Sequence, residues 1–347
     1  HVMVREGGAR RDLAEISKVK DAGIDLRRLI LVTDGVGPKD LLEKGYMEDV
    51  VQTAIRCGFN PAQAVQMATI NAADYFQLDG IIGGIAPGKY ADLVIVPDPE
   101  TIQAEVVISK GDIIVKEGKL LASPRVHAFS EHSLKTVHLP RPLDPSDFLI
   151  HAGGEAPFLE VRVIDQVTDL VTREHITSVP VRNGEIRSDV TKDLLKVAAV
   201  DRKFSPGKTF VGLVRGFGMK AGALASSGAW DTPDIIVVGQ NDEDMALAVN
   251  RIRDLQGGAL ICAHGQILAE IPLPVFGLLS QLSLRALAKT SEEITKAARG
   301  LGCPFQDPLR TLVTLTGAAI PFLRICEEGL VDIKSGKTMG LIVERMG

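Results

Sequence analysis

The apolar pattern at the start of the chain predicts two buried strands joined by a helix. Residues 29–33 are an uninterrupted aliphatic and β-branched run, typical of a strand buried on both faces in a parallel sheet or an α/β barrel. Residues 1–4 have the same strand-like character. Between the two runs, apolar residues repeat with helical spacing over residues 11–22. Strand, helix and strand in this order predict a βαβ unit with parallel, right-handedly connected strands.

The following stretch predicts helices and then a small sheet. Helical segments are expected from Pro38, over 47–57 and over 61–68, and Asn71 is expected to cap a short helix that ends at residue 75. A Pro-Gly turn at 87–88 then leads into short strands at 91–96, 106–108, 113–115 and 119–121. Residues 123–150 hold several prolines with little periodicity, which indicates a linker.

The remainder of the chain predicts a separate α/β or α+β domain. Strand-like runs occur at 159–164, 194–200, 210–214 and 235–238. Asn241 is a good helix cap, three acidic residues follow it, and the apolar positions after them share one helical face until Gly257. A further helix is expected over 284–299.

Composition narrows the class of protein. The 347 residues are 45% hydrophobic and 24% charged with a net charge of -5, which argues against binding to nucleic acid or to an anionic membrane. The four cysteines are far apart and form no C-x-x-C pair, so we expect a reducing cytoplasm rather than a disulfide framework or structural zinc. No apolar run is long enough to span a bilayer, and no signal peptide is evident. The chain opens at His1 inside a strand-like run, which suggests a processed or truncated piece.

The candidate chemistry gathers at the strand ends. Asp34 directly follows the second strand, and the carboxyl ends of barrel strands form the active face. The alternative is that Asp34 only caps the turn before Gly35. Arg5 and Glu6 follow the first strand and could line the same pocket, or they could simply pair with each other or form a turn. Asp231 is a further candidate in the C-terminal part. The histidines of the proline-containing segment lack the spacing of metal ligands.

Several motifs resemble one family. Residues 84–94 are similar to the β-sandwich motif of the amidohydrolase superfamily, and the Asn-Ala-Ala of 71–73 precedes it as in that superfamily. Residues 31–44 resemble the last barrel strand and loop of bacterial and archaeal adenine deaminases. Residues 216–220, 225–227, 237–251, 273–274 and 277–278 resemble that family's C-terminal domain. The resemblance runs in order along almost the whole chain.

The resemblance implies a fold and an activity. It implies the C-terminal remnant of a (β/α)8 barrel over 1–76, a composite β-sandwich module over 77–125, a linker over 126–150 and an adenine deaminase-type domain over 151–347. The implied reaction is metal-dependent hydrolytic deamination of adenine to hypoxanthine and ammonia, in purine salvage. Asp34 would be a ligand of a divalent manganese, iron or zinc ion and would shuttle a proton. The implied partners are a purine substrate and further copies of the chain.

Departures from the family keep alternatives open. The superfamily's histidines of the earlier barrel strands are absent, and Gly35, Gly37 and Tyr46 stand where the family has aspartate, histidine and histidine. Residues 201–204 and 229–234 also lack the family's histidines. Whether this chain binds the metal by itself is therefore open. One alternative is an inactive or repurposed relative that serves as a scaffold or oligomerisation piece, and another is a deaminase or cyclic amidohydrolase with a different substrate. An incomplete barrel also predicts self-association.

Overall fold

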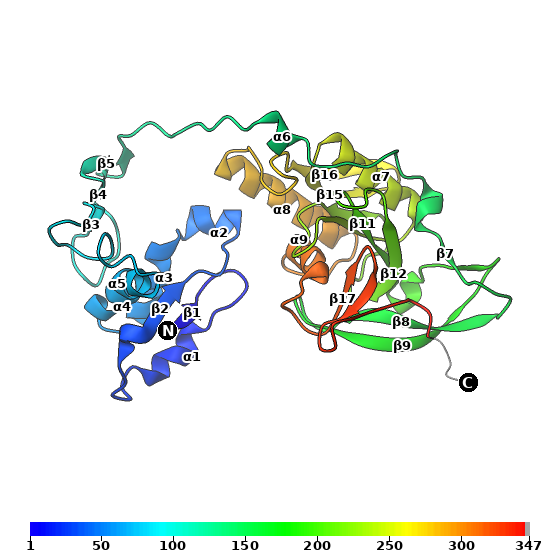
Figure 1. Cartoon of the computed structure of the whole chain (residues 1–347), viewed down its shortest axis with the longest axis horizontal. Helices are drawn as coiled ribbons and strands as arrows, with labels where there is room; N and C mark the ends of the chain where they lie inside the picture. The colour runs from blue at the N-terminus through cyan, green and yellow to red at the C-terminus, as the bar shows by residue number, and fades with distance from the viewer. Residues whose placement is uncertain (344–347) are drawn as a thin grey trace. The chain divides into compact units, whose positions relative to one another are not determined.

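The computed structural model describes residues 1–343 and divides the chain into two compact units. The first unit is His1–His127 and the second begins at Ala128, and each is described by itself (Figure 1). None of the helices within residues 1–343 combines the length and apolar character that crossing a bilayer requires.

The first unit opens with the predicted βαβ arrangement. Strands β1 (Val2–Arg5) and β2 (Leu29–Val32) pair in parallel, with Val2 opposite Leu29 and Arg5 opposite Val32, which confirms the parallel pairing. The connecting helix α1 (Leu13–Ile16) is shorter than the predicted 11–22 and continues as a 3-10 turn, Ser17–Val19. The Ser17 hydroxyl bonds back to the Ala14 carbonyl at 2.8 Å, a contact that competes with regular helix hydrogen bonding.

Four helices follow β2, and the last three of them contact this strand. They are α2 (Pro38–Glu43), α3 (Met47–Arg56), α4 (Pro61–Ala68) and α5 (Ile70–Tyr75). Their apolar positions join the strands in one core, which includes Val4, Leu31, Ala54 and Met67. The helices predicted over 47–57 and 61–68 are confirmed.

Asn71 does not cap a helix as predicted. Thr69 precedes α5, and Asn71 lies inside the helix, buried. Its side-chain Nδ2 donates to the carbonyl oxygens of Leu26 (3.1 Å) and Leu29 (2.8 Å). The amide thus satisfies two backbone acceptors at the start of β2, a long-range role that no local pattern reveals.

The end of the first unit is a four-stranded antiparallel sheet in the order β3-β4-β5-β6. Its strands are Leu93–Ile95, Val106–Ser109, Asp112–Lys116 and Lys119–Leu120. In the described part of the chain these strands form a single sheet, and the assignment of residues 77–125 to a composite β-sandwich module stays a prediction.

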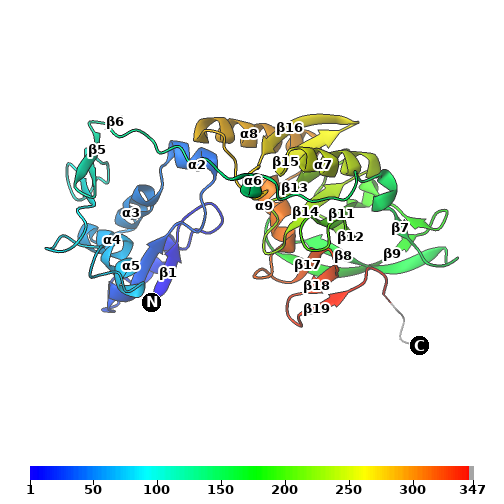
Figure 2. The ribbon, with the colours of Figure 1, turned by 45° about the horizontal axis from the view of Figure 1, so that its top comes forward.

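The second unit is built on an eight-stranded sheet in the order β16-β15-β13-β14-β11-β12-β8-β9 (Figure 2). All neighbouring pairs are antiparallel except β12 with β8. In chain order the strands are Phe158–Gln166 (β8), Thr172–Pro180 (β9), Leu194–Asp201 (β11), Thr209–Arg215 (β12), Ala223–Ser226 (β13), Asp234–Gly239 (β14), Gly258–Ala263 (β15) and Gln266–Pro272 (β16).

Both faces of the central strands are covered, which explains their continuous apolar sequence. Alternate residues of a strand point to opposite faces, so Val197 of β11 enters one core and Ala198 enters the other. Helix α7 (Asp242–Asp254) covers the second core. The first core is covered by α8 (Leu284–Gly300), α9 (Pro308–Val313) and a small sheet, β17 (Leu323–Cys326), β18 (Gly329–Asp332) and β19 (Lys337–Met339).

The segment interpreted as a linker over 126–150 belongs largely to the second unit. It holds α6 (Glu131–Leu134) and a 3-10 turn, Pro145–Phe148, and then enters β7 (Ile150–His151), which pairs with β10 (Glu185–Ile186). Val137, Leu143 and Phe148 are buried in the core under α7. This segment therefore packs against the second unit as an irregular strap. Its few buried apolar residues follow no periodic pattern, which is why the sequence indicated a linker.

Candidate active site

The structure brings Arg5 and Asp34 together at the carboxyl end of the parallel pair. Arg5 is the last residue of β1, and Asp34 lies two residues beyond β2. The Arg5 Nη1 to Asp34 Oδ2 distance is 3.5 Å, and the Asp34 side chain is 45% exposed. Asp34 has a φ of 53°, in the left-handed region, and Gly35 follows with a φ of 88°. The carboxylate therefore projects from a tight turn at the predicted face.

Arg5 also contacts a second acid. Its Nε donates to Asp12 Oδ2 at 3.1 Å, so the guanidinium bridges Asp12 and Asp34. Ion pairs this exposed contribute about 0–1 kcal/mol each to stability. Their main effect is therefore to orient the Asp34 carboxylate rather than to hold the unit together.

Glu6 continues the same edge. Its backbone N–H donates to the Val32 carbonyl at 2.9 Å, and its carboxylate accepts from the Leu13 N–H at 3.3 Å. Glu6 also lines a cleft of about 580 Å³ between the strand-end loops and the α2 and α3 region. The cleft carries acids from both sides, Glu6 and Asp49 among them, together with Tyr46. Asp34 does not line this cleft, although its neighbour Val36 does.

The two strand-end loops touch through glycine backbone, which sequence reasoning missed. A Cβ on Gly7 would lie 1.8 Å from the Thr33 carbonyl oxygen. The Gly8 N–H donates to the Gly35 carbonyl at 2.8 Å, which ties the loop after β1 to the turn that holds Asp34. The pair of adjacent glycines two residues after a strand was the available signal.

The described residues do not by themselves fit a divalent metal. Within residues 1–343 no group of three or more histidine, cysteine, aspartate or glutamate side chains could hold such an ion. The nearest charged group to the Asp34 carboxylate is the Arg5 guanidinium, itself a cation. Among the described residues, Asp34 is therefore a single candidate metal ligand without further ligands around it.

Asp231 has a structural role in its loop. Its Oδ2 accepts from the Ala318 N–H at 2.7 Å, and its φ of 62° is left-handed. The neighbouring Trp230 N–H donates to the Val313 carbonyl at 3.0 Å. These contacts join the 229–234 loop to the region after α9, and Asp231 lies far along the chain from Asp34, in the other unit.

Asp234 is a buried acid that sequence reasoning passed over. It begins β14, is 0% exposed, and neither carboxylate oxygen makes a hydrogen bond of good geometry within the described residues. Burial raises the pKa of Asp234 to about 6, the carboxylates of Glu327 and Asp201 act in the same direction, and the Thr232 hydroxyl opposes them. The missing family histidines drew attention to residues 229–234, but nothing in the sequence distinguished Asp234 itself.

Arg202 is the buried cation of the same region. Its Nη1 donates to the Thr136 carbonyl at 3.0 Å and its Nη2 to the Phe276 carbonyl at 3.2 Å. Burial lowers the pKa of Arg202, and the charges of Asp234 and Asp201 oppose that shift. Arg202 thus clamps two distant backbone segments at the end of the sheet.

Two known protein families match this chain, one in each of the two units. Residues 1–120 match the amidohydrolase family, and residues 169–337 match the adenine deaminase C-terminal domain. The first unit, with its carboxylate at the end of a parallel strand, is thus of amidohydrolase type. An amidohydrolase crystal structure from Thermotoga maritima aligns with 30% of this chain and 35% of its own at 23% identity, with a TM-score of only 0.20.

Curated relatives extend the match along the chain. An adenine deaminase from Moorella thermoacetica is 38% identical over 344 residues, which are 99% of this chain and 58% of that protein. Adenine deaminases from Dehalococcoides mccartyi strain 195 (37%) and Clostridium botulinum strain 657 (34%) match 97% and 99% of this chain and 58% of their own lengths. Along almost its whole length the chain is therefore similar to proteins named adenine deaminase. It spans 58% of the length of these relatives.

Proposed function

We propose that the chain takes part in the hydrolytic deamination of adenine to hypoxanthine and ammonia. The observation that carries the proposal is the position of Asp34, a carboxylate at the carboxyl end of the second of two parallel strands and oriented by Arg5. Its relatives carry the name adenine deaminase. The same likeness supports a homo-oligomer that works in cytoplasmic purine salvage.

In this proposal Asp34 moves the proton. The carboxylate takes a proton from a water molecule as the water oxygen bonds to the ring carbon that bears the amine. The same proton then passes to the amine nitrogen, the carbon–nitrogen bond breaks, and ammonia leaves. Arg5 is a positioning residue in this proposal, because its guanidinium lies 3.5 Å from the Asp34 carboxylate.

The test is a direct assay of the purified full chain. Ammonia and hypoxanthine are measured with adenine as substrate, with manganese, iron or zinc added in separate arms. Removal of a general base costs roughly 10²- to 10⁴-fold in rate, so Asp34→Asn is expected to lose at least 100-fold. The matched control is Asp21→Asn, which removes an exposed carboxylate of the same unit, 81% exposed, and is expected to leave the rate unchanged.

Two results contradict this proposal. Full activity in Asp34→Asn would remove Asp34 from the reaction. Absence of ammonia release in every metal arm would favour the second candidate, a non-catalytic relative that serves in assembly.

One observation favours that second candidate. No metal-holding cluster occurs among the described residues, and β1 bares Val2 at 54% and Met3 at 44% exposure. Exposed apolar residues on a two-stranded sheet favour association with another chain. Sedimentation of the wild type and of Met3→Lys tests it, and an unchanged molecular mass would contradict a role of this face in assembly.

A further inference from the structure

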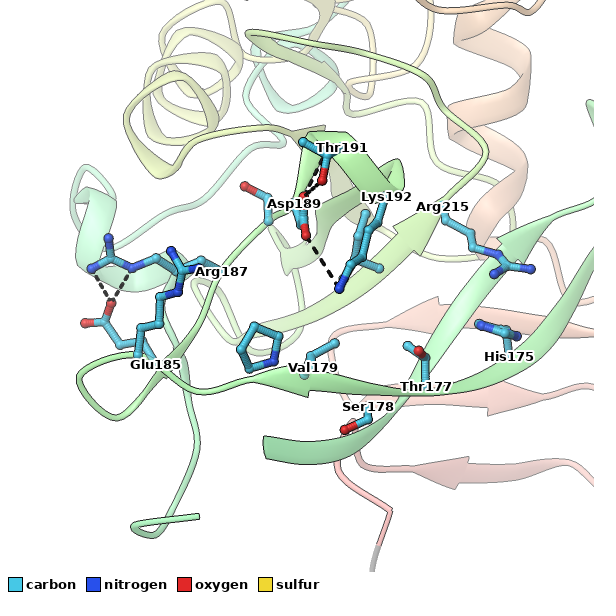
Figure 3. A pocket seen from close by; sticks show the side chains of 14 residues that line it. His175, Thr177, Ser178, Val179, Glu185, Arg187, Asp189, Thr191, Lys192 and Arg215 are labelled. Atoms are coloured by element: carbon cyan, nitrogen blue, oxygen red, sulfur yellow. Dashed lines mark hydrogen bonds and ion pairs between the residues drawn. The ribbon is translucent and has the colours of Figure 1, made fainter. Parts of the chain in front are cut away.

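The second unit contains a cleft that is distinct from the proposed active site. It has a volume of about 450 Å³ and lies between the edge strand β9 and the segment that runs from β10 to β11 (Figure 3). His175, Thr177 and Val179 alternate along β9, so their side chains share the face of the strand that lines the cleft. Volumes of roughly 300–1,000 Å³ are those of small-molecule sites.

The lining of the cleft has an excess of positive charge. Arg182, Arg187, Lys192 and Arg215 are cationic, whereas the acids are Glu185 and Asp189, and the chain as a whole carries a net charge of -5.

Both acids are already engaged. Glu185 accepts from Arg187 Nη2 at 3.1 Å, and Asp189 accepts from the N–H (3.0 Å) and the hydroxyl (2.5 Å) of Thr191 (Figure 3). Lys192 Nζ forms an ion pair with Asp189 at 3.8 Å, which is longer than a hydrogen bond (Figure 3). Its ammonium therefore keeps its donors for a ligand.

Arg215, at another end of the lining, is held by a buried acid. The buried carboxylate of Asp165 accepts from Arg215 Nε at 2.6 Å and Nη2 at 3.1 Å. The same carboxylate also accepts from Arg173 Nε at 2.5 Å. The charge of Asp193 also acts on Arg215. The positive excess of the cleft therefore comes from its lining side chains taken together.

We propose that this cleft binds a small organic phosphate ester. Guanidinium groups match the geometry of phosphate oxygens, and Arg182, Lys192 and Arg215 supply the cations around one space. The carbon skeleton of the ester would pack on the apolar part of the lining, Val179 and Leu194. A free phosphate ion would leave most of the 450 Å³ unfilled.

The experiment measures binding to the full chain by isothermal titration calorimetry. The probes are ribose 5-phosphate, ribose and inorganic phosphate, none of which carries a purine, so the outcome does not depend on the proposed deaminase site. Ribose 5-phosphate is expected to bind with saturation, at least tenfold more tightly than inorganic phosphate, and ribose is expected not to bind. Binding is also expected to weaken as salt is raised, because charge attraction is screened.

Variants locate the site. The double substitution Arg182→Ala, Lys192→Ala is expected to weaken ribose 5-phosphate binding at least tenfold. Arg182 is exposed and the Lys192 side chain is 66% exposed, so both changes are compatible with folding. The matched control, Lys289→Ala, Lys296→Ala, removes two exposed lysines of α8 and is expected to bind like the wild type.

Three outcomes overturn the proposal. They are absence of saturable binding of ribose 5-phosphate, equal affinity for inorganic phosphate or ribose, and an equal loss of affinity in the control variant.

Discussion

Replacement of Asp234 by asparagine tests how burial sets the protonation state of the Asp234 carboxyl group and, through it, the stability of the second unit. Asparagine has nearly the shape of aspartate and is neutral at every pH. Asp234 is 0% exposed, and within residues 1–343 its carboxylate has no hydrogen bond of good geometry. Because the two side chains are nearly the same size, the change is expected to fold.

The magnitude follows from the pKa shift. The pKa of Asp234 rises from its ordinary 3.8 to about 6 because burial disfavours the charged form. The folded state therefore holds the proton more tightly than the unfolded state, and this stabilising contribution is complete below pH 3.8 and is lost as pH rises through 6. At pH 8 the ionised carboxylate costs about 3 kcal/mol, at 1.36 kcal/mol per unit.

The expected result is a pH-dependent gain in stability. At pH 8, Asp234→Asn should raise the free energy of unfolding by up to about 3 kcal/mol, and at about 2–4 °C per kcal/mol the Tm should rise by up to roughly 10 °C. At pH 4 the wild-type carboxyl is protonated in the folded state, so the variant and the wild type should differ little.

The assay is urea unfolding at pH 4 and pH 8, followed by tryptophan fluorescence. The chain has a single tryptophan, Trp230, so the signal reports the second unit alone. Asp254→Asn, an exposed acid at the end of α7, is the control and should show no such pH dependence. The reasoning is refuted if Asp234→Asn changes stability equally at both pH values, or if it destabilises the unit at pH 8.

Two further predictions concern the first unit. Asn71→Ala should lower the free energy of unfolding of this unit by about 2–4 kcal/mol, because two buried carbonyl groups lose their donor. The control, Gln63→Ala, removes an exposed amide and should change the free energy little. Equal denaturation midpoints for the two variants would contradict the role of the Asn71 amide. Gly7→Ala should lower the Tm and reduce any deaminase rate, because the new Cβ would lie 1.8 Å from the Thr33 carbonyl oxygen. In Gly37→Ala the new Cβ meets nothing within 4 Å, so this control should behave like the wild type in thermal melts and in the ammonia assay.

The sequence by itself determined the elements whose information is local. The parallel pairing of β1 and β2 followed from two aliphatic runs on either side of a helical pattern. Helix α7 followed from a cap, since Asn241 does accept from the Asp244 N–H at 2.7 Å. The position of Asp34 at a strand end was read in the same way, because a strand that stops at a polar residue puts that residue at the sheet edge.

Tertiary structure alone decided how distant segments use their polar groups. Strands β13 and β15 and the strap around Phe148 were not predicted, and neighbours on both faces of the sheet bury them. The burial of Asp234 and the carbonyl contacts of Asn71 have the same origin. The carbonyl partners of Asn71 lie more than 40 residues away along the chain. The free energy of burying a polar group depends on what the folded chain brings beside it.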